Sequence, residues 1–494
     1  RSVRLGRTSM TMKALSSRGA LRWVAAVAVF ALAAALAAAP ALSAQQAPDT
    51  LRLSVEDAVA RILRGSDESR IADAQVDLAD AAVTSARAAG LPQLRLNATN
   101  QQVLKNARAE IVGAVFNQNY VYTANLNLQQ AVFQGGRIFA AAQAAARVEQ
   151  AAELTRDETR AQLAVQIQAV YLNAVFTARI AEIQATNLRL ADERVAQAEQ
   201  LERAGRASRY DVLRARVERD NLEPELRAAE ATRTLADLEL RRLLDLPPQQ
   251  PLALVTALDA ARVREMAAAA SGRTANERAA VRAAELTAQA RRAGIRVARA
   301  DLLPSITAGF TFGYLAFPDS PGFPTRGGDR GNEFCPAGAP PTQQCQNSGW
   351  FPDRNFSIQL SWPLFDGLRA KGQLDLAQAQ AQIADLQARQ LREAASIEVQ
   401  QAQAELVRAQ AVAAARETTV REAEEAYELA TLRLARGVGT QLEVSDAQLA
   451  LLRARSTDAR AVFDLYLAVA ELARVRAEPI PLPDGSTVPT RQTN

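Results

Sequence analysis

One series of sequence landmarks occurs twice along this chain, and that duplication restricts the fold more than any other feature. Each copy has a Leu-Pro that ends a helical stretch, then a Phe-x-Gly motif, then a glycine shortly before a helix start. The paired landmarks are Pro92 and Pro304, Phe133 and Phe365, and Gly205 and Gly437. The first pair is 212 positions apart and the others are 232 apart, so the second copy has a 20-residue insertion after its Leu-Pro. A long-spaced repeat predicts two structurally equivalent halves.

Two alternating segments follow the Leu-Pro landmark in each copy. Proline cannot donate to a helix ladder and favours extended geometry in the residue before it. Apolar and polar residues then alternate, which predicts strands at about 94–103 and 120–133 in the first copy and at about 305–315 and 355–365 in the second. Alternation with a very polar second face is typical of transmembrane β-strands. A half-buried strand of a soluble sheet gives the same pattern.

A long helix comes next in each copy. The number of residues between Gly135 and Gly205 is 69, and the same number separates Gly367 from Gly437. At 1.5 Å per residue, each helix spans roughly 100 Å. Both stretches are rich in alanine, whose small side chain lets neighbouring helices approach closely. Equal lengths indicate that both helices serve one structure of fixed depth.

A short turn reverses each long helix, at about 204–208 and 436–440. Glycine just past the last helical turn is a common C-cap. Ser208 and Thr440, each followed by an acid three residues later, predict capping boxes that start the return helices. Each copy therefore ends in a helical hairpin.

The N-terminal region predicts a secretory signal peptide over 1–44. Basic residues precede an apolar run, Trp23–Ala39, and small residues then predict cleavage after Ala44 or after Ala41. The alternative is an uncleaved anchor, although the run is short for a membrane span. We find no later segment that resembles a transmembrane helix. A membrane-embedded part of the mature chain must then be a closed barrel of strands.

The two cysteines, Cys335 and Cys345, lie in a Pro- and Gly-rich stretch inside the insertion. Two close cysteines in an exported loop predict a disulfide, which we expect to face the cell exterior. Two free thiols are the alternative.

Composition argues against several function classes. The chain has no histidine, the commonest general base and metal ligand. It also lacks phosphate-loop, dinucleotide-binding and nucleophile-elbow motifs, so we predict no catalytic residue, cofactor or metal site. The formal charge of +4 is spread over interspersed acids and bases, which indicates solvated helix faces and no nucleic-acid partner.

These motifs, doubled and in register, resemble the TolC family of outer-membrane efflux proteins over about 51–477. The resemblance implies a mainly α fold with a β-barrel part, built from a duplicated unit of helix, strand pair and long helical hairpin. The two repeats are 45–250 and 251–477, followed by a Pro-rich tail, 478–494, that we expect to be extended or disordered. Three chains would form a homotrimer with a 12-stranded outer-membrane β-barrel continuous with a periplasmic α-helical barrel.

The same resemblance implies a function. The protein would be the passive exit duct of a tripartite efflux or type I secretion system in the outer membrane. Its partners would be a periplasmic adaptor and an inner-membrane pump or ABC exporter. The hairpin tips would contact the adaptor through Gly205, Ser208, Gly437 and Thr440.

A closed periplasmic gate is also implied. The matching positions are Tyr210 and Asp211 for links between hairpins, and Glu443 and Asp446 for acidic rings around the axis. The chain departs from the family pattern at Gly439, where a linking arginine is expected, and at Leu434, where a tyrosine is expected. The departures imply either weaker links or substitution of that arginine by Arg209 or Arg436.

Three other classes of protein are alternatives, and each would have sequence features that differ from those of this chain. A periplasmic adaptor usually has one helical hairpin between small β-domains, whereas this chain has two hairpins and paired amphipathic strands. A trimeric coiled-coil stalk would show sustained heptads, which these alanine-rich helices lack. A periplasmic enzyme would need a constellation of reactive residues, and none is recognisable.

Overall fold

The computed structural model describes residues 50–105, 120–270, 278–318 and 350–489. The predicted signal peptide, 1–44, and the predicted disulfide between Cys335 and Cys345 lie outside the described residues. Nearly all described residues belong to one compact unit, 53–248 with 254–494. The second unit contributes only short described segments, among them parts of two paired strands, β1 (Leu51–Leu53) and β4 (Leu252–Leu254).

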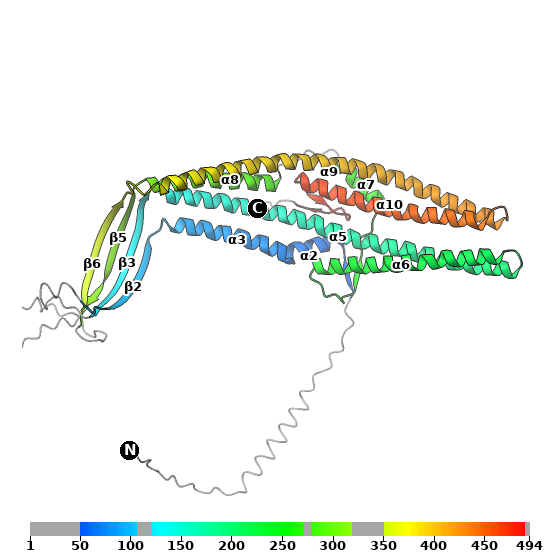
Figure 1. The fold of residues 1–494 in the computed structure, drawn as a ribbon, viewed down its shortest axis with the longest axis horizontal. Helices are drawn as coiled ribbons and strands as arrows, with labels where there is room; N and C mark the ends of the chain where they lie inside the picture. Colours follow the sequence, from blue (N-terminus) through cyan, green and yellow to red (C-terminus); the bar gives the residue numbers. More distant parts are fainter. Residues whose placement is uncertain (1–49, 106–119, 271–277, 319–349, 490–494) are drawn as a thin grey trace, which may run out of the picture. The chain divides into compact units, whose positions relative to one another are not determined.

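Four long strands form one antiparallel sheet in the order β2-β3-β5-β6 (Figure 1). These strands are β2 (Gln93–Gln102), β3 (Tyr120–Gln134), β5 (Ser305–Ala316) and β6 (Trp350–Ser361). Each half of the chain supplies two neighbouring strands. The alternating pattern continues to Leu364, but β6 ends at Ser361 because Pro363 has no N–H to donate to a ladder.

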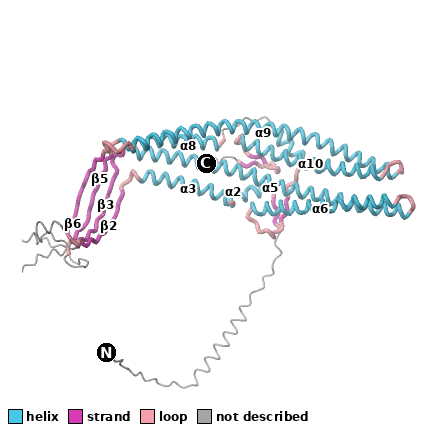
Figure 2. The backbone as a smooth tube through the Cα atoms, in the orientation of Figure 1, coloured by secondary structure: helices cyan, strands magenta, loops and turns pink. Residues whose placement is uncertain are grey.

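Eight α-helices make up most of the described chain (Figure 2). They are α2 (Val55–Gly65), α3 (Asp67–Ala88), α5 (Arg137–Arg203), α6 (Arg209–Leu243), α7 (Ala260–Ala270), α8 (Ala279–Arg299), α9 (Arg369–Ala435) and α10 (Gln441–Val475); a 3-10 turn, η2 (Ala300–Leu302), follows α8. Helices α5 and α9 have 67 residues each, and α6 and α10 have 35 each. The prediction of equally long helices is confirmed.

The helices pack side by side in the same order as the strands to which they connect. Helix α3 contacts α5, α5 contacts α8, and α8 contacts α9. Beyond α3 and α8, α6 and α10 take their places, so that α6 contacts α5 and α10 contacts both α5 and α9. Alanines fill most of these contacts, as in the cluster of Ala288, Ala384 and Ala388 between α8 and α9. Small side chains let the helices form a thin layer instead of a wide globular core.

Helix α5 contains a stretch that is long and apolar enough to cross a membrane. Our sequence expectation that no such segment would occur after the N-terminal region was therefore wrong. Within the described unit, however, 44% of that stretch is buried, because α5 packs against helices on both sides. Its apolar residues are explained by these helix contacts.

We expected an extended or disordered tail, and for 478–489 the disordered alternative was wrong. Strands β7 (Ile480–Pro481) and β8 (Thr487–Val488) form a small hairpin around Gly485, whose φ is +98°. Ile480 is 0% exposed and Leu482 is 2% exposed. The prolines restrict the chain here, but the apolar residues between them anchor it to the helices.

Candidate functional site

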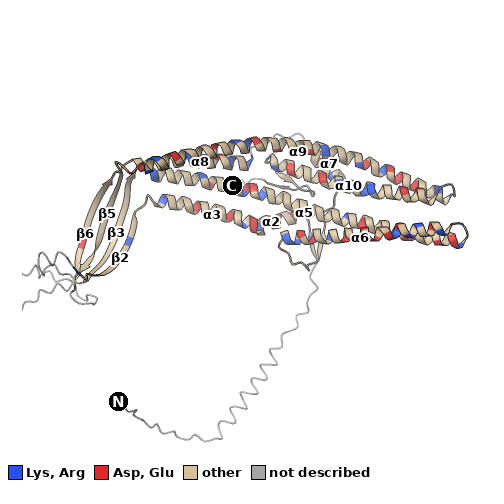
Figure 3. Ribbon diagram, viewed as in Figure 1, with Lys and Arg blue, Asp and Glu red and all other residues tan. Residues whose placement is uncertain are grey.

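The sheet has one apolar and one polar face, set by strand alternation. Across all four strands, Leu94, Leu128, Phe310 and Phe356 lie in one row. The neighbouring row on the other face contains Arg95, Asn127, Thr311 and Asn355. Only three charged residues, Arg95, Asp353 and Arg354, occur in these strands, whereas charges cover the helices (Figure 3). Arg354 lies on the same face as Phe356, opposite Phe312, and its guanidinium is 5.2 Å from the centre of the Phe312 ring. The face that contains Leu94 is therefore mainly apolar, and the opposite face is mainly polar.

The apolar face is not covered by the described part of this chain. Leu94 is 62% exposed, Phe356 is 65% exposed and Ile358 is 67% exposed. In a half-buried sheet of a soluble protein, this face would pack against a core. Here the apolar side chains are exposed instead. A row of large exposed side chains across a whole sheet requires another apolar phase to cover it.

Strands β2 and β6 are the outer strands of the sheet, and within the described residues each is paired on one side only. They are 10 and 12 residues long. Long unpaired edges present free N–H and C=O groups and are usually blocked or paired. These edges are thus available to other strands.

The two hairpin turns lie at the far ends of α5 and α9 from the strands that precede these helices. Gly205 has φ +69° and Gly437 has φ +76°, left-handed conformations that favour glycine. Ser208 and Thr440 are the N-caps of α6 and α10. All four residues that we expect to contact an adaptor are exposed at these tips.

The first turn has the predicted capping box. Ser208 Oγ accepts from the Asp211 amide at 3.2 Å, and the Ser208 amide donates to Asp211 Oδ2 at 3.0 Å. The hydroxyl of Ser208 also donates to that carboxylate at 2.7 Å. These hydrogen bonds, the hydroxyl first, lower the pKa of Asp211 below its usual value of 3.8.

The predicted capping box at the second turn is only half correct. Thr440 Oγ1 accepts from the Glu443 amide at 3.2 Å, but Glu443 does not return a bond to the Thr440 amide. Its carboxylate instead pairs with Arg433 at 3.5 Å, across the turn. An arginine in the last turn of α9 thus competes with the Thr440 amide for the Glu443 carboxylate. Arg209 and Arg436, the candidate substitutes for the linking arginine, make no ion pair within the described residues.

Gly439 has a steric reason for departing from the family's arginine. A Cβ at this position would lie 2.9 Å from Arg433 Cβ and 2.9 Å from the Leu434 amide nitrogen. The Gly439 amide donates to the Arg433 carbonyl at 3.1 Å, which holds the two backbones together. Any side chain here must shift the turn.

The other gate candidates lie near a polar network that joins the two hairpins. Glu218 on α6 accepts from Arg214 at 3.0 Å and from Ser445 on α10 at 2.8 Å. The guanidinium of Arg194 on α5 lies 3.5 Å from Ser445 Oγ. The hydrogen bond to Glu218 chiefly raises the pKa of Arg214, with smaller contributions from Tyr210 and Asp446. Tyr210 and Asp446 are themselves exposed.

Sequence reasoning missed this network. Its residues come from three helices, and the α6–α10 bond joins positions 227 apart. No local sequence motif predicts such a contact. Burial lowers the pKa of Arg194, which marks it as the least solvated member.

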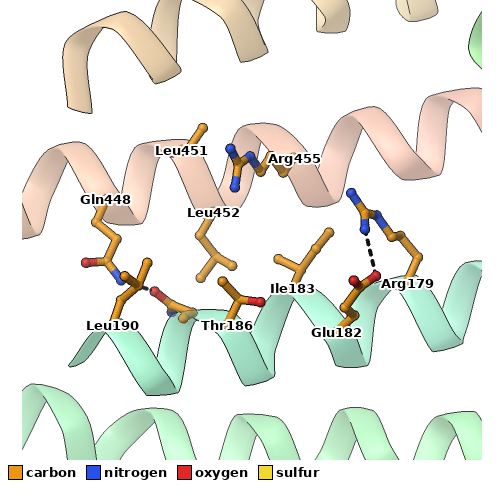
Figure 4. Close-up of a pocket in the computed structure, with 10 residues that line it drawn as sticks. Arg179, Glu182, Ile183, Thr186, Leu190, Gln448, Leu451, Leu452 and Arg455 are labelled. Atoms are coloured by element: carbon orange, nitrogen blue, oxygen red, sulfur yellow. Dashed lines mark hydrogen bonds and ion pairs between the residues drawn. The ribbon is translucent and has the colours of Figure 1, made fainter. Parts of the chain in front are cut away.

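A shallow cleft of about 140 Å³ lies between α5 and α10 (Figure 4). It is lined by Ile183, Leu190 and Leu452, with Arg179 paired to Glu182 at 2.6 Å. Gln448 donates to Asn187 at one end, and both side chains are 6% exposed. The cleft is the seam between the hairpins. Among the described residues, no group of three or more Cys, Asp or Glu could hold a metal ion.

A second missed feature is a buried ion network in the helical layer. Glu158 on α5 accepts from Arg278 at 2.6 Å and from Arg474 on α10 at 3.0 Å. The three side chains are only 10–12% exposed. Arg278 also pairs with Glu398 on α9, so one cluster ties three helices together at the start of α8.

Each half of the chain supplies two strands of the sheet and one long helical hairpin. The family to which the sequence matches agrees with this arrangement. Residues 58–245 and 270–477 match the family described as outer membrane efflux protein. The chain belongs to this family. The resemblance read from the sequence is thus confirmed, and the efflux protein is not an enzyme.

Solved structures show the same fold. The outer membrane protein VceC from Vibrio cholerae is 22% identical, covering 85% of this chain and 95% of that one, with a TM-score of 0.68. The MtrE channel of Neisseria gonorrhoeae, in an open state, is 20% identical over 86% and 89%, with a TM-score of 0.66. The CmeC channel of Campylobacter jejuni is 13% identical over 85% of both chains, with a TM-score of 0.69. No curated protein sequence matched the chain.

Family membership fixes the location and general activity. The efflux protein is an exit duct of the outer membrane that extends into the periplasm. Members of the family work as trimers together with an adaptor and an inner-membrane pump.

Proposed function

We propose that three copies of this chain close into one passive duct. Three four-stranded sheets would form a 12-stranded barrel, and the helices would form an α-helical tunnel continuous with it. The observation that carries this proposal is the sheet itself, whose apolar face is uncovered and whose two long edges are unpaired within the described residues.

Lipid makes closure necessary. Backbone N–H and C=O groups cannot remain unpaired in a bilayer, so a four-stranded sheet with free edges cannot be inserted alone. Pairing β6 of one copy with β2 of the next satisfies both edges at once and repeats around a threefold axis. The apolar row then faces lipid, and the row containing Asn127 and Thr311 faces a water-filled lumen.

The outermost helices support the same arrangement. On α3, Ile71 is 57% exposed and Leu78 is 72% exposed. On α9, Leu376 and Ile383 are 51% and 54% exposed. In both pairs the residues are seven positions apart, so each pair lies on one face of its helix. Helices α3 and α9 lie at opposite edges of the helical layer. In the trimer, α3 of one copy would therefore contact α9 of the next.

Adjacent residues of β3 provide a matched test. Leu128→Arg places a charge on the proposed lipid face and costs about 2–4 kcal/mol at mid-membrane. Asn127→Arg places the same charge on the proposed lumen face. We expect Leu128→Arg to remove most trimers from the outer membrane and Asn127→Arg to retain them, measured by native mass spectrometry after detergent extraction. Equal loss in both variants, or a monomer in the unmodified protein, contradicts the barrel.

The periplasmic end is proposed to carry the gate, with Tyr210 and Asp211 on the first hairpin and Glu443 and Asp446 on the second. Because Arg433 compensates Glu443, Asp446 should supply most of the uncompensated charge of the acidic rings. In planar bilayers, Asp446→Ala should reduce cation selectivity and block by multivalent cations more than Glu443→Ala. Unchanged selectivity in the double variant excludes the rings without affecting the duct.

Docking to the adaptor is proposed at Gly205, Ser208, Gly437 and Thr440. Positive φ and open space around Gly205 mean that a side chain there strains the backbone without a clash. Gly205→Val should abolish export while trimers remain, whereas Gly205→Asn, which tolerates this conformation, should retain export. Loss of trimers in Gly205→Val would assign this glycine a structural role.

The energy for export is proposed to come from the inner-membrane pump or ABC exporter, because no nucleotide-binding motif occurs in the chain. The purified trimer should therefore hydrolyse no ATP, and deleting the gene should raise sensitivity to drugs, dyes or metals, or block secretion of a protein.

We also propose that Cys335 and Cys345 form a disulfide at the cell surface. Thiol labelling of intact cells that appears only after reduction would support it.

A further inference from the structure

The turn of the first hairpin, taken with the helix residue on each side of it, carries three arginines and no acid over 203–209. Arg203, Arg206 and Arg209, here called the basic tip, lie within seven positions, and all three residues are exposed. None of them makes an ion pair or side-chain hydrogen bond within the described residues. Other arginines on the same helices are paired, such as Arg216 with Glu199 at 2.6 Å and Arg219 with Asp192 at 2.9 Å.

The second hairpin shows that the turn does not need these charges. At the repeat spacing of 232, the three arginines correspond to Ala435, Val438 and Gln441. Both turns have the same backbone bonds: the Arg206 amide donates to the Leu201 carbonyl at 2.8 Å, and the Val438 amide donates to the Arg433 carbonyl at 3.1 Å. One turn geometry is therefore compatible with three charges or with none at these positions.

Local electrostatics favour one arginine of the basic tip and oppose another. Arg203 is in the last turn of α5, where the negative end of the helix dipole favours a cation. Arg209 is the first residue of α6, where the positive end of the helix dipole disfavours a cation. Three like charges on a short turn also repel one another. The dipole effects at Arg203 and Arg209 oppose each other and the repulsion is unfavourable, so local electrostatics do not explain three arginines here. The charges fit a partner outside this chain.

We propose that the basic tip binds a carboxylate-rich surface of the periplasmic adaptor. This inference rests on the proposed docking at the hairpin tips and specifies its chemistry. A guanidinium can form two parallel hydrogen bonds with one carboxylate. Ala204, Gly205 and Ala207 separate the arginines, and these small residues let a protein surface approach closely.

The choice of partner follows from the composition of the turn. Residues 203–209 contain no large apolar side chain that could insert into an anionic membrane. In the proposed trimer the first hairpins would present nine arginines from these turns, against three from Arg436 of the second hairpins. The two kinds of tip would thus bind chemically different parts of the adaptor.

The low lysine content makes a direct test practical. The chain has only three lysines, Lys13, Lys105 and Lys371, and none lies near the turns. Arg206→Lys keeps the charge and adds one amine, which a zero-length carbodiimide joins only to a carboxylate in contact. Val438→Lys is the matched control at the equivalent position of the second hairpin.

In intact cells, we expect the amine of the Arg206→Lys variant to couple to an Asp or Glu of the adaptor, with roughly tenfold less coupling in Val438→Lys. Equal coupling in the two variants overturns the proposal. A photo-crosslinker at Ala207 separates the remaining outcomes. Capture of the adaptor without carboxylate coupling in Arg206→Lys rejects the acidic contact and keeps the docking. Capture of phospholipid rejects the protein partner. Failure to capture the adaptor at either tip rejects the docking as well.

A charge-removing variant gives a second readout. The combined substitutions Arg203→Ala, Arg206→Val and Arg209→Gln install the residues of the second hairpin. We expect trimers to remain and photo-crosslinking to the adaptor to fall about tenfold, with its dependence on salt removed. Unchanged crosslinking with unchanged salt dependence contradicts the proposal.

Discussion

The two halves of this efflux protein have hairpin helices of the same lengths and different stabilising side chains. Helices α5 and α9 both have 67 residues, and each reverses through a five-residue turn. The first turn is held by a reciprocal capping box, whereas the second combines a single cap with the ion pair between Arg433 and Glu443. Backbone geometry has therefore been kept while the contacts that hold it have diverged.

The helices that lead into the strands differ in the same way. Helix α3 starts at Ser66, whose hydroxyl accepts from the Ser69 amide at 3.1 Å. Helix α8 starts at Arg278, 212 positions later, which has no side-chain cap and instead enters the buried network around Glu158. A local cap has been replaced by a contact that joins distant helices. The two halves should then respond differently to equivalent changes.

The largest difference should come from these two helix starts. Glu158→Gln removes one buried partner of Arg278 and Arg474 and should lower the free energy of unfolding by about 3 kcal/mol. The loss should not be larger, because each arginine still pairs with another acid. Ser66→Ala should cost about 1 kcal/mol, the usual value for a lost N-cap. Urea unfolding followed by helical circular dichroism measures both. A smaller loss for Glu158→Gln than for Ser66→Ala would show that the network is not stabilising.

The next difference concerns the tightest point of each turn. Gly439→Ala forces a Cβ against the Arg433–Leu434 backbone and should cost about 1–3 kcal/mol locally, as overpacking does. Its equivalent, Ala207, already accommodates a Cβ, so Ala207→Gly should cost less than about 1 kcal/mol. Hydrogen exchange of 436–443 and 204–211 reports each turn separately. Similar exchange in the two variants would mean that Gly439 can relax freely.

The caps should differ by a smaller amount. Ser208→Ala removes a cap and also frees Asp211, so it should cost about 1 kcal/mol or slightly more. Thr440→Ala removes one bond and leaves the Arg433–Glu443 pair intact, so its cost should be lower. Faster exchange of the Glu443 amide in Thr440→Ala than of the Asp211 amide in Ser208→Ala would reverse this ranking.

The smallest effect should be a pH dependence restricted to the first turn. The pKa of Asp211 is lower in the folded state than its usual 3.8, mainly because the Ser208 hydroxyl donates to it. Its contribution is therefore complete above that value and is lost as pH falls through the lower folded-state pKa. Protection of the first turn should decrease below about pH 4. In Asp211→Asn this decrease should disappear; its persistence would assign the pH dependence to another group.

Periodicity predicted the regular part of this fold. The doubled landmarks indicated two strand pairs and two long hairpins, because turns, prolines and alternation are local signals. The Ser208 cap was predicted for the same reason. The pattern at Thr440 was identical, yet Glu443 turned to Arg433, since a local motif does not show which of two partners a carboxylate prefers.

The remainder depended on contacts that no local pattern encodes. Glu158 meets Arg278 and Arg474 at separations of 120 and 316 positions. The prolines of the tail left a disordered chain open as an alternative, but Ile480 and Leu482 are buried and β7 contacts α5 and α10. The reason for glycine at 439 required the distance between two backbones.

Equal helix lengths also constrain how such a chain can change over evolution. Deleting seven residues from α5 alone would shorten that arm by roughly 10 Å and leave the two tips at different depths. The return helix α6 would lose its partner over the same distance. A viable change in reach must therefore remove or add matching segments at four places in the gene, two in each half. Point substitutions can accumulate one at a time, but the length of the duct can change only through coordinated insertions or deletions.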